Sequence, residues 1–158
     1  FSASGYGWLG AFIALAALLG SLSARYFLKR YLAVNLIATG CIIMLISSII
    51  LLIDILLLNI NVQDTWLCVL MIILPMMGII YGGFGFVIPM TLSTALQKYQ
   101  SVLGTAGACF GLSYYIVIAF LTWVMGFIHN GTLYPMPIYF LILSILSLMV
   151  YVLLVRDA

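Results

Sequence analysis

The stretch from Tyr31 to Ile53 reads YLAVNLIATGCIIMLISSIILLI and holds no Asp, Glu, Lys or Arg. Its apolar residues run continuously and do not alternate with polar ones, which favours a helix over a strand of a membrane barrel. Because a helix needs about 20 apolar residues to span a bilayer, this stretch is long enough to cross one. Three more stretches are equally free of charged residues: Phe1–Ala24, Thr65–Gln97 and Tyr99–Val155.

The composition of the chain points to the same environment. Of its 158 residues, 67% are hydrophobic and 5% are charged, and the mean hydropathy is +1.37. Soluble domains carry roughly 25% charged residues, so this chain has too few charged residues to cover a surface that faces water. A bilayer requires instead that backbone groups bond within helices or a closed barrel. The sequence therefore predicts an all-α fold, a polytopic transmembrane helix bundle in a single domain (residues 1–158), and gives no support to nucleic-acid binding. The five predicted spans cover about residues 6–24, 32–58, 66–92, 104–127 and 136–155.

The basic residues fall at three places between or after these spans. Arg25, Lys29 and Arg30 follow the first span, Lys98 follows the third, and Arg156 follows the fifth. If the chain starts outside and crosses five times, all of them lie on the inner side, where Lys and Arg are enriched. This threading predicts a multi-pass protein of the cell (inner or plasma) membrane, with the N-terminus of this chain outside and its C-terminus in the cytoplasm.

The first residues of the chain lack the features of a signal peptide. They read Phe-Ser-Ala-Ser, with neither an initiator Met nor a basic segment. Since the threading starts outside, we expect at least one more span upstream, and we expect this chain to be a piece of a longer protein.

Small residues in the third and fourth spans form two small-xxx-small motifs, Gly78–Gly82 and Gly107–Gly111. Such motifs let helix backbones approach closely in a membrane, so one interpretation is static packing. The other is that a Gly-rich helix, kinked near Pro75 and Pro89, flexes while a transporter alternates its access. The residues that we assign to packing or flexing are Gly78, Gly82, Gly83, Gly85, Pro89, Gly107 and Gly111.

Aromatic residues at mid-membrane depth are candidates for a substrate cavity. Tyr81 lies on the third predicted span, and Phe110, Tyr114 and Tyr115 lie on the fourth. Together they could line a cavity for apolar molecules or cationic aromatics. Lipid-facing or packed positions are the alternative for each of them.

Asp54 is the one carboxylate inside an apolar run. A charge in hydrocarbon is costly, so an intramembrane Asp is a candidate for proton coupling. Asp54 also lies close to the predicted outer end of its span, where it could reach headgroups or water, and a polar contact between helices is a third interpretation. His129, in the last outer loop, is either a solvated loop residue or a pH sensor.

Residue patterns for catalysis or metal binding do not occur in the chain. Cys41, Cys68 and Cys109 lie in or at the edge of apolar spans without metal-ligand spacing, and we interpret them as small packing residues. No Ser/His/Asp set, HExxH motif or phosphate loop is found. We therefore expect no enzyme activity, no cofactor and no metal.

Two segments carry a resemblance to a known family. The segment 20–30, with Gly20, Arg25, Lys29 and Arg30, resembles the basic inner-loop signature in the second half of the major facilitator superfamily, with Ala24 where the pattern has an acidic residue. Segments 82–96 and 104–108 resemble the bicyclomycin-resistance type of drug/proton antiporters, with Met90 where members often have Asn. The resemblance covers essentially the whole chain, as the eighth to twelfth helices of a twelve-helix transporter.

The resemblance implies a partial major facilitator fold, from the C-terminal half of a secondary active transporter. The third span would face the cavity with Met77, Tyr81 and Phe84, the first and fourth spans would flank it, and the second and fifth would face lipid. The implied activity is proton-coupled efflux of drugs or other small molecules by alternating access. The implied partners are the lipid bilayer, protons as the coupling ion, the small-molecule substrate and the N-terminal half of the same transporter. Two alternatives are an importer of a siderophore, sugar or amino acid from the same superfamily, and a non-transporting scaffold subunit.

Overall fold

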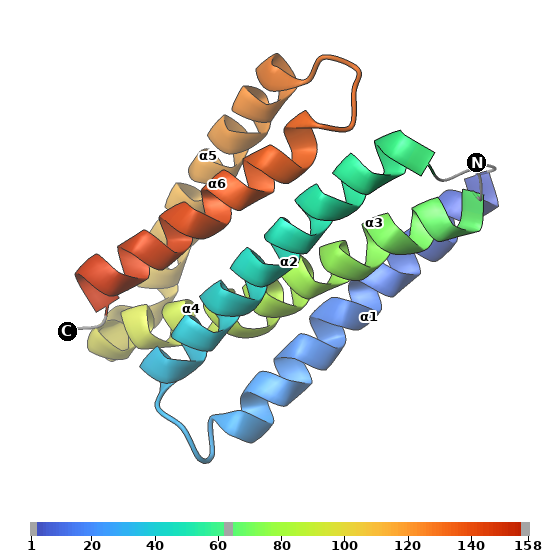
Figure 1. Cartoon of the computed structure of the whole chain (residues 1–158). Coiled ribbons are helices and arrows are strands. Elements are labelled where there is room, and N and C mark those ends of the chain that lie inside the picture. The colour runs from blue at the N-terminus through green and yellow to red at the C-terminus, as the bar shows by residue number, and fades with distance from the viewer. Residues whose placement is uncertain (1–2, 62–64, 156–158) are drawn as a thin grey trace.

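The computed structural model describes residues 3–61 and 65–155, and it describes side chains over residues 10–57 and 67–153. The described residues form helices and contain no β-strand, which confirms the predicted all-α fold. The helices run side by side as an antiparallel bundle (Figure 1). In chain order the elements are α1 (Ala3–Phe27), α2 (Ala33–Asn61), α3 (Thr65–Ile80), the π-helix η1 (Tyr81–Val87), α4 (Ile88–Leu96), the 3-10 helix η2 (Gln97–Val102), α5 (Leu103–Ile128), α6 (Pro135–Val150) and the π-helix η3 (Tyr151–Val155).

Among the described residues, four helical stretches are long and apolar enough to cross a membrane: Gly10–Phe27, Ala33–Leu57, Leu67–Ile128 and Pro135–Leu153. The third holds 62 residues, which as a straight helix would measure about 93 Å, roughly three times the thickness of a bilayer core. It reverses direction in η2, where Tyr99 has the non-helical angles φ −119° and ψ 30°. The stretch therefore makes two legs, α3–η1–α4 and α5 (Figure 1), and five crossings of a bilayer remain our prediction.

The connections between legs alternate between the two ends of the bundle. The α1–α2 turn and η2 lie at one end, and the α5–α6 connection lies at the other (Figure 1). All described Lys and Arg residues belong to the first end: Arg25, Lys29 and Arg30 at the α1–α2 turn, and Lys98 in η2. Arg156 lies outside the described residues. This arrangement is the one that the predicted threading requires.

Helix α2 lies at the centre of the described bundle. It packs against α3, η1, α6 and α4, and it supplies buried residues to both apolar clusters of the core, including Leu36 and Cys41 in one and Leu51 in the other. The expectation that the second span faces lipid is therefore wrong for most of this helix. The exposed residues described in α2 lie on its opposite side: Asn35, Thr39, Ile42, Ile46, Ile49, Ile50, Ile53, Leu56 and Leu57.

The irregular part of the third leg differs from the predicted pair of kinks. Helix α3 continues through Pro75 without interruption, and the departure from α-helix is the π-helix η1, directly before α4. Pro89 lacks an N–H to bond the carbonyl of Gly85, and its ring crowds that carbonyl. The wider turn relieves this crowding, and the N–H of Ile88 instead bonds the carbonyl of Gly83, five residues back.

The predicted loops are shorter and more helical than expected. Helix α1 continues to Phe27, three residues beyond the predicted end of its span, and α2 continues to Asn61, into the predicted outer loop. Residues 93–103, between the third and fourth predicted spans, are also helical: α4 continues to Leu96, and the 3-10 helix η2 covers Gln97–Val102. Short helical connections are expected where backbone groups near a bilayer must bond one another.

Candidate functional site

The π-helix η1 lies between α1 and α2 with almost no space between the three backbones. A methyl group placed on Gly20 of α1 would lie 2.7 Å from the carbonyl oxygen of Tyr81 and 2.8 Å from the Cα of Gly85. A methyl group on Gly85 would lie 2.5 Å from the Cα of Gly20. Real Cβ atoms do not approach other atoms this closely, so both positions require glycine for this packing.

The opposite side of η1 makes a second close approach, to α2. A methyl group on Gly82 would lie 2.7 Å from the carbonyl oxygen of Gly40, and one on Gly40 would lie 2.9 Å from the carbonyl oxygen of Gly82. Gly78 in α3 leaves no room for a side chain against Ser47. A methyl group on Gly83 would make only an ordinary contact, 3.5 Å from the sulfur of Met44. The glycines of the third leg therefore favour the packing interpretation, and the flexing interpretation stays a prediction.

The glycines of α5 lie in a different environment. Nothing among the described atoms comes within 4 Å of a methyl group placed on Gly104, Gly107 or Gly111. None of the described residues of α5 is buried, so this helix is held to the rest of the chain by few contacts. The tight crossing predicted for Gly107–Gly111 has no partner helix in residues 3–61 or 65–155.

An apolar cavity of about 570 Å³ lies between α5, α6 and η1. The hydroxyl of Tyr139 in α6 donates a hydrogen bond of 2.7 Å to the carbonyl of Leu121 in α5 and joins the two helices beside this cavity. Phe84 from η1 and Tyr114 from α5 line it, and both are among the predicted cavity residues. The wall is completed by Ile118, Leu121, Thr122, Met125, His129, Thr132, Leu133, Met136, Tyr139, Phe140 and Leu143. Its size suits a small organic molecule.

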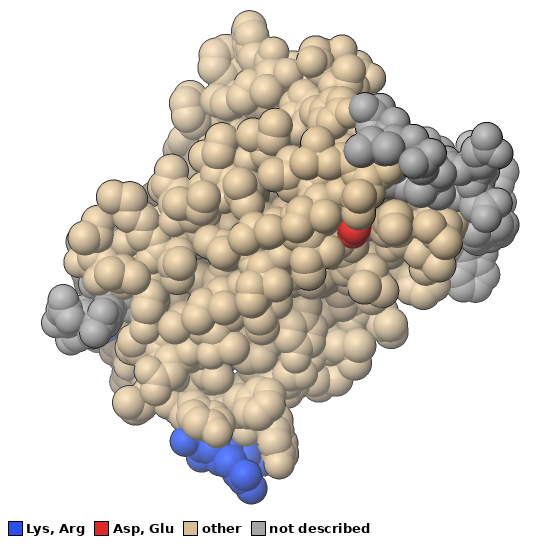
Figure 2. Space-filling view, viewed as in Figure 1, with Lys and Arg blue, Asp and Glu red and all other residues tan. Residues whose placement is uncertain are grey.

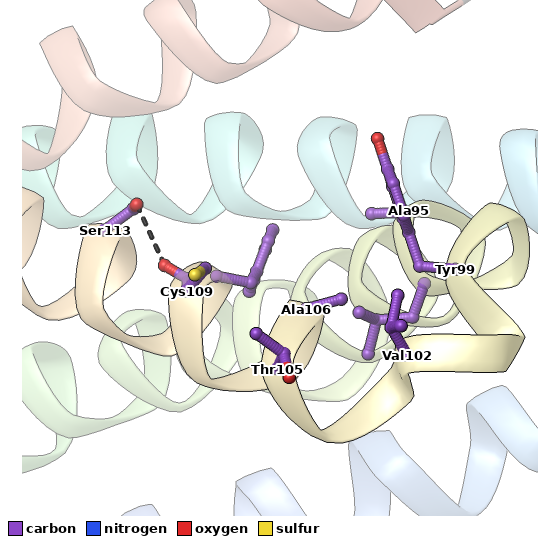
Figure 3. Close-up of a pocket in the computed structure, with 9 residues that line it drawn as sticks. Ala95, Tyr99, Val102, Thr105, Ala106, Cys109 and Ser113 are labelled. Atoms are coloured by element: carbon purple, nitrogen blue, oxygen red, sulfur yellow. Dashed lines mark hydrogen bonds between the residues drawn. The ribbon is translucent and has the colours of Figure 1, made fainter.

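The other predicted cavity residues are divided among different places. Phe110 lines a cavity of about 520 Å³ between α4, η2 and the first turns of α5 (Figure 3). Tyr81 lines a cavity of about 310 Å³ near the α1–α2 turn, and its ring packs against Phe86 at 5.5 Å between centroids. Tyr115 is 70% exposed, and Met77 in α3 is partly buried and lines none of these three cavities. The structure therefore groups only Phe84 with Tyr114.

Asp54 lies in α2, partly buried, seven residues before the last residue of that helix. This spacing corresponds to about 10 Å, which agrees with a position near one end of the leg. His129 is exposed and follows the last residue of α5. Among the described His, Cys, Asp and Glu residues, no three are grouped in a way that could hold a metal ion.

A buried pair of hydroxyl groups joins α2 to α6 and was not predicted from the sequence. The Oγ atoms of Ser48 and Ser144 lie 2.9 Å apart, and each also lies within bonding distance of a carbonyl in its own helix, Met44 at 2.7 Å and Phe140 at 2.8 Å. Each hydroxyl has one proton, so one serine donates to the other while the acceptor donates to its own backbone. The pair Ser47–Ser48 within the apolar run was the available signal.

Replacing Ser144 with alanine should lower the free energy of unfolding by about 1 kcal/mol, since interhelical hydrogen bonds in membranes contribute this order. The loss is modest because Ser48 keeps its bond to Met44. The measurement is an SDS titration of the protein in mixed micelles. The matched control is Ser113→Ala, whose exposed hydroxyl bonds only within α5 and should change the value by less than about 0.5 kcal/mol. Equal losses in both variants would contradict the role of the buried pair.

Comparisons with known proteins connect the chain to a small set of bacterial relatives. It is 34% identical over 148 residues to a protein named "Uncharacterized transporter" from Rickettsia felis, covering 92% of this chain and 36% of that protein. A protein of the same name from Rickettsia bellii is 33% identical over 144 residues, covering 90% of this chain and 35% of its own length. An uncharacterized protein from Rickettsia conorii is 46% identical over 81 residues, covering 51% of this chain and 66% of its own length.

The chain spans about a third of the length of the two transporter-named relatives. No family model matches the chain, and no solved structure matches it.

Proposed function

We propose that this chain is part of a secondary active transporter, which moves a small molecule across a membrane without covalent chemistry. The observation that carries the proposal is the interrupted third leg, where the π-helix η1 (Tyr81–Val87) separates α3 from α4 inside one apolar stretch. π-helical segments inside α-helices occur often at functional sites, and Phe84 of η1 lines the cavity of about 570 Å³ between α5 and α6. The names of the two longer Rickettsia relatives support the same class.

The candidate substrate site is the cavity between α5, α6 and Phe84. Its lining is mainly aromatic and aliphatic, with polar atoms from Tyr139, Thr122 and His129. A cavity of this kind suits an apolar or aromatic cargo, with few hydrogen bonds to fix its orientation. We therefore propose drugs or other small apolar molecules, including aromatic cations, as substrates.

The packing of the legs supports alternating access. The α1–η1–α2 unit is held by backbone contact at Gly20, Gly40, Gly82 and Gly85, whereas α5 has no buried residue among those described. We propose that α5 moves against this rigid unit, with η2 as the hinge, because Tyr99 already departs from helical geometry there. Proton-coupled efflux is the direction and coupling that we propose.

The test uses the complete gene product that contains this chain, reconstituted in vesicles with an imposed proton gradient. The probe is ethidium, an aromatic cation whose fluorescence reports accumulation. We expect ethidium to move away from the side that holds the α1–α2 turn, and this movement should stop when an ionophore removes the gradient. Accumulation on the side of that turn would favour an importer, and no movement of ethidium or other small aromatic cations would favour a scaffold.

Replacing Asp54 with Asn should leave at least about half of the gradient-driven ethidium transport, because its place near the end of α2 lets water or headgroups solvate the carboxylate without a coupling role. The measurement is the initial rate in the same vesicles. Complete loss of transport in a variant that still folds would instead assign proton coupling to Asp54.

A further inference from the structure

The α1–α2 turn concentrates positive charge at one corner of the bundle. Arg25, Lys29 and Arg30 are all exposed there. Figure 2 shows a blue patch of Lys and Arg residues at the foot of the molecule, where Figure 1 has the α1–α2 turn. Asp54 is the only carboxylate among the described residues, and it lies 21 residues along α2 from Ala33, about 31 Å away. The described part of the chain therefore provides no acidic partner for this patch.

Backbone hydrogen bonds fix the shape of the turn. The N–H groups of Arg30 and Tyr31 both donate to the carbonyl of Phe27 at 2.9 Å, and the N–H of Leu28 donates to the carbonyl of Ala24 at 2.9 Å. Helix α1 ends at Phe27 and α2 begins at Ala33, so the negative end of one helix dipole and the positive end of the other meet at this turn and largely offset each other. The positive charge of the corner therefore comes from its side chains. The turn thus presents cations from an ordered backbone.

A cavity of about 310 Å³ opens beside the same turn. Its apolar wall consists of Phe27, Tyr31, Leu36, Ile43, Tyr81 and Phe86, and Asn35 and Thr39 add polar atoms. Lys29 and Arg30 lie between Phe27 and Tyr31 in the chain, so the cations are within one or two residues of the cavity wall. The rings of Phe27 and Tyr31 lie 6.2 Å apart, centroid to centroid.

We propose that this corner binds an anionic phospholipid, with its phosphate on Arg25, Lys29 and Arg30 and the upper part of an acyl chain in the adjoining cavity. The cations have charge complementarity with an anionic headgroup, to which each basic residue near the surface adds affinity. Exposed Tyr26 and Tyr31 suit the headgroup layer, where aromatic rings are enriched. The mainly apolar cavity next to the cations distinguishes this ligand from a soluble phosphate. The site does not depend on the proposed transport function.

The experiment is native mass spectrometry of the complete gene product in a neutral detergent, titrated with phosphatidylglycerol, phosphatidylcholine or glycerol phosphate. We expect phosphatidylglycerol to bind about tenfold more tightly than phosphatidylcholine, and glycerol phosphate not to compete. The double variant Lys29→Gln/Arg30→Gln should reduce phosphatidylglycerol binding to the level of phosphatidylcholine, whereas the charge-preserving Lys29→Arg/Arg30→Lys should keep it.

Two matched controls test the contribution of the charge and the contribution of the cavity separately. Lys98→Gln removes an exposed cation at the same end of the bundle and should leave binding within about twofold. Thr39→Trp fills the cavity and should weaken binding about tenfold, whereas Ile46→Trp, on the exposed side of α2, should not. Equal binding of the two phospholipids, competition by glycerol phosphate, or equal effects of a variant and its control would overturn the proposal. Since Lys29 and Arg30 are exposed turn residues, their variants decide the question even if Thr39→Trp fails to fold.

Discussion

Replacing Gly20 with alanine is expected to lower the free energy of unfolding by about 3 kcal/mol, the upper end of the usual cost of overpacking a well-filled core. The new methyl group would lie 2.7 Å from the carbonyl oxygen of Tyr81 and 2.8 Å from the Cα of Gly85. Both atoms belong to the backbone of η1, so no side-chain rotation can relieve the clash. The measurement is an SDS titration in mixed micelles, and Gly85→Ala should give a similar loss.

The control for this prediction is Gly107→Ala in α5. A methyl group there meets nothing within 4 Å among the described atoms, and alanine is a better helix former than glycine by about 1 kcal/mol. We expect this variant to unfold at the same free energy or up to about 1 kcal/mol higher. If the free energy of unfolding falls in Gly20→Ala but not in Gly107→Ala, the loss comes from the close approach of the α1 and η1 backbones. If Gly20→Ala were as stable as Gly107→Ala, the close approach of α1 and η1 would be wrong.

Replacing Thr122 with tryptophan is expected to reduce ethidium transport by about tenfold or more, which corresponds to about 1.4 kcal/mol of lost stabilisation. Thr122 is an exposed residue of α5 that lines the cavity of about 570 Å³ between α5 and α6. An indole at this position would occupy space that the proposed substrate needs. The measurement is the initial rate of gradient-driven ethidium movement by the complete gene product in vesicles.

Val117→Trp provides the matched control for the cavity. Val117 is 55% exposed on α5 and lines neither this cavity nor the one between α4 and α5. The Val117→Trp variant should transport ethidium at close to the rate of the unchanged protein. Equal transport by both variants would show that the substrate passes elsewhere, even if the protein is a transporter.

The layout of the legs could be predicted from the sequence because a membrane chain must form long apolar helices. Runs without charged residues marked the legs, and basic residues marked one end of the bundle. Gly78 and Gly82, four residues apart, also predicted a close approach. The structure places both glycines against α2, at Ser47 and Gly40.

The rotation of each helix about its axis could not be predicted. In a soluble helix a polar face marks the side that is exposed, but α2 is apolar on all sides, and its central position was therefore missed. For the same reason Gly40 was overlooked as a partner of Gly82, and Ser144 as a partner of Ser48. The positions of the aromatic candidates could not be predicted for the same reason. Tyr114 lines the cavity and its neighbour Tyr115 is 70% exposed, and only the direction of the side chain distinguishes them.

The π-helical form of residues 81–87 depends on more than one local signal. Pro89 predicted an irregularity, as did the nearby glycines. Pro75 carries the same local signal, yet α3 continues through it. The difference is that the turn before Pro89 packs by backbone contact against two other helices, a tertiary feature that no short segment of sequence contains.

The most direct test of the central claim, an antiparallel bundle that crosses a membrane with its basic end inside, is the sidedness of single cysteines in intact cells. The background is the complete gene product with its own cysteines replaced by serine or alanine. Ser101→Cys lies in η2 and Thr132→Cys lies in the α5–α6 connection, and both positions are exposed. We predict that a membrane-impermeant maleimide labels Thr132→Cys in intact cells and labels Ser101→Cys only after the cells are opened. Labelling of both cysteines from the same side would contradict the bundle topology.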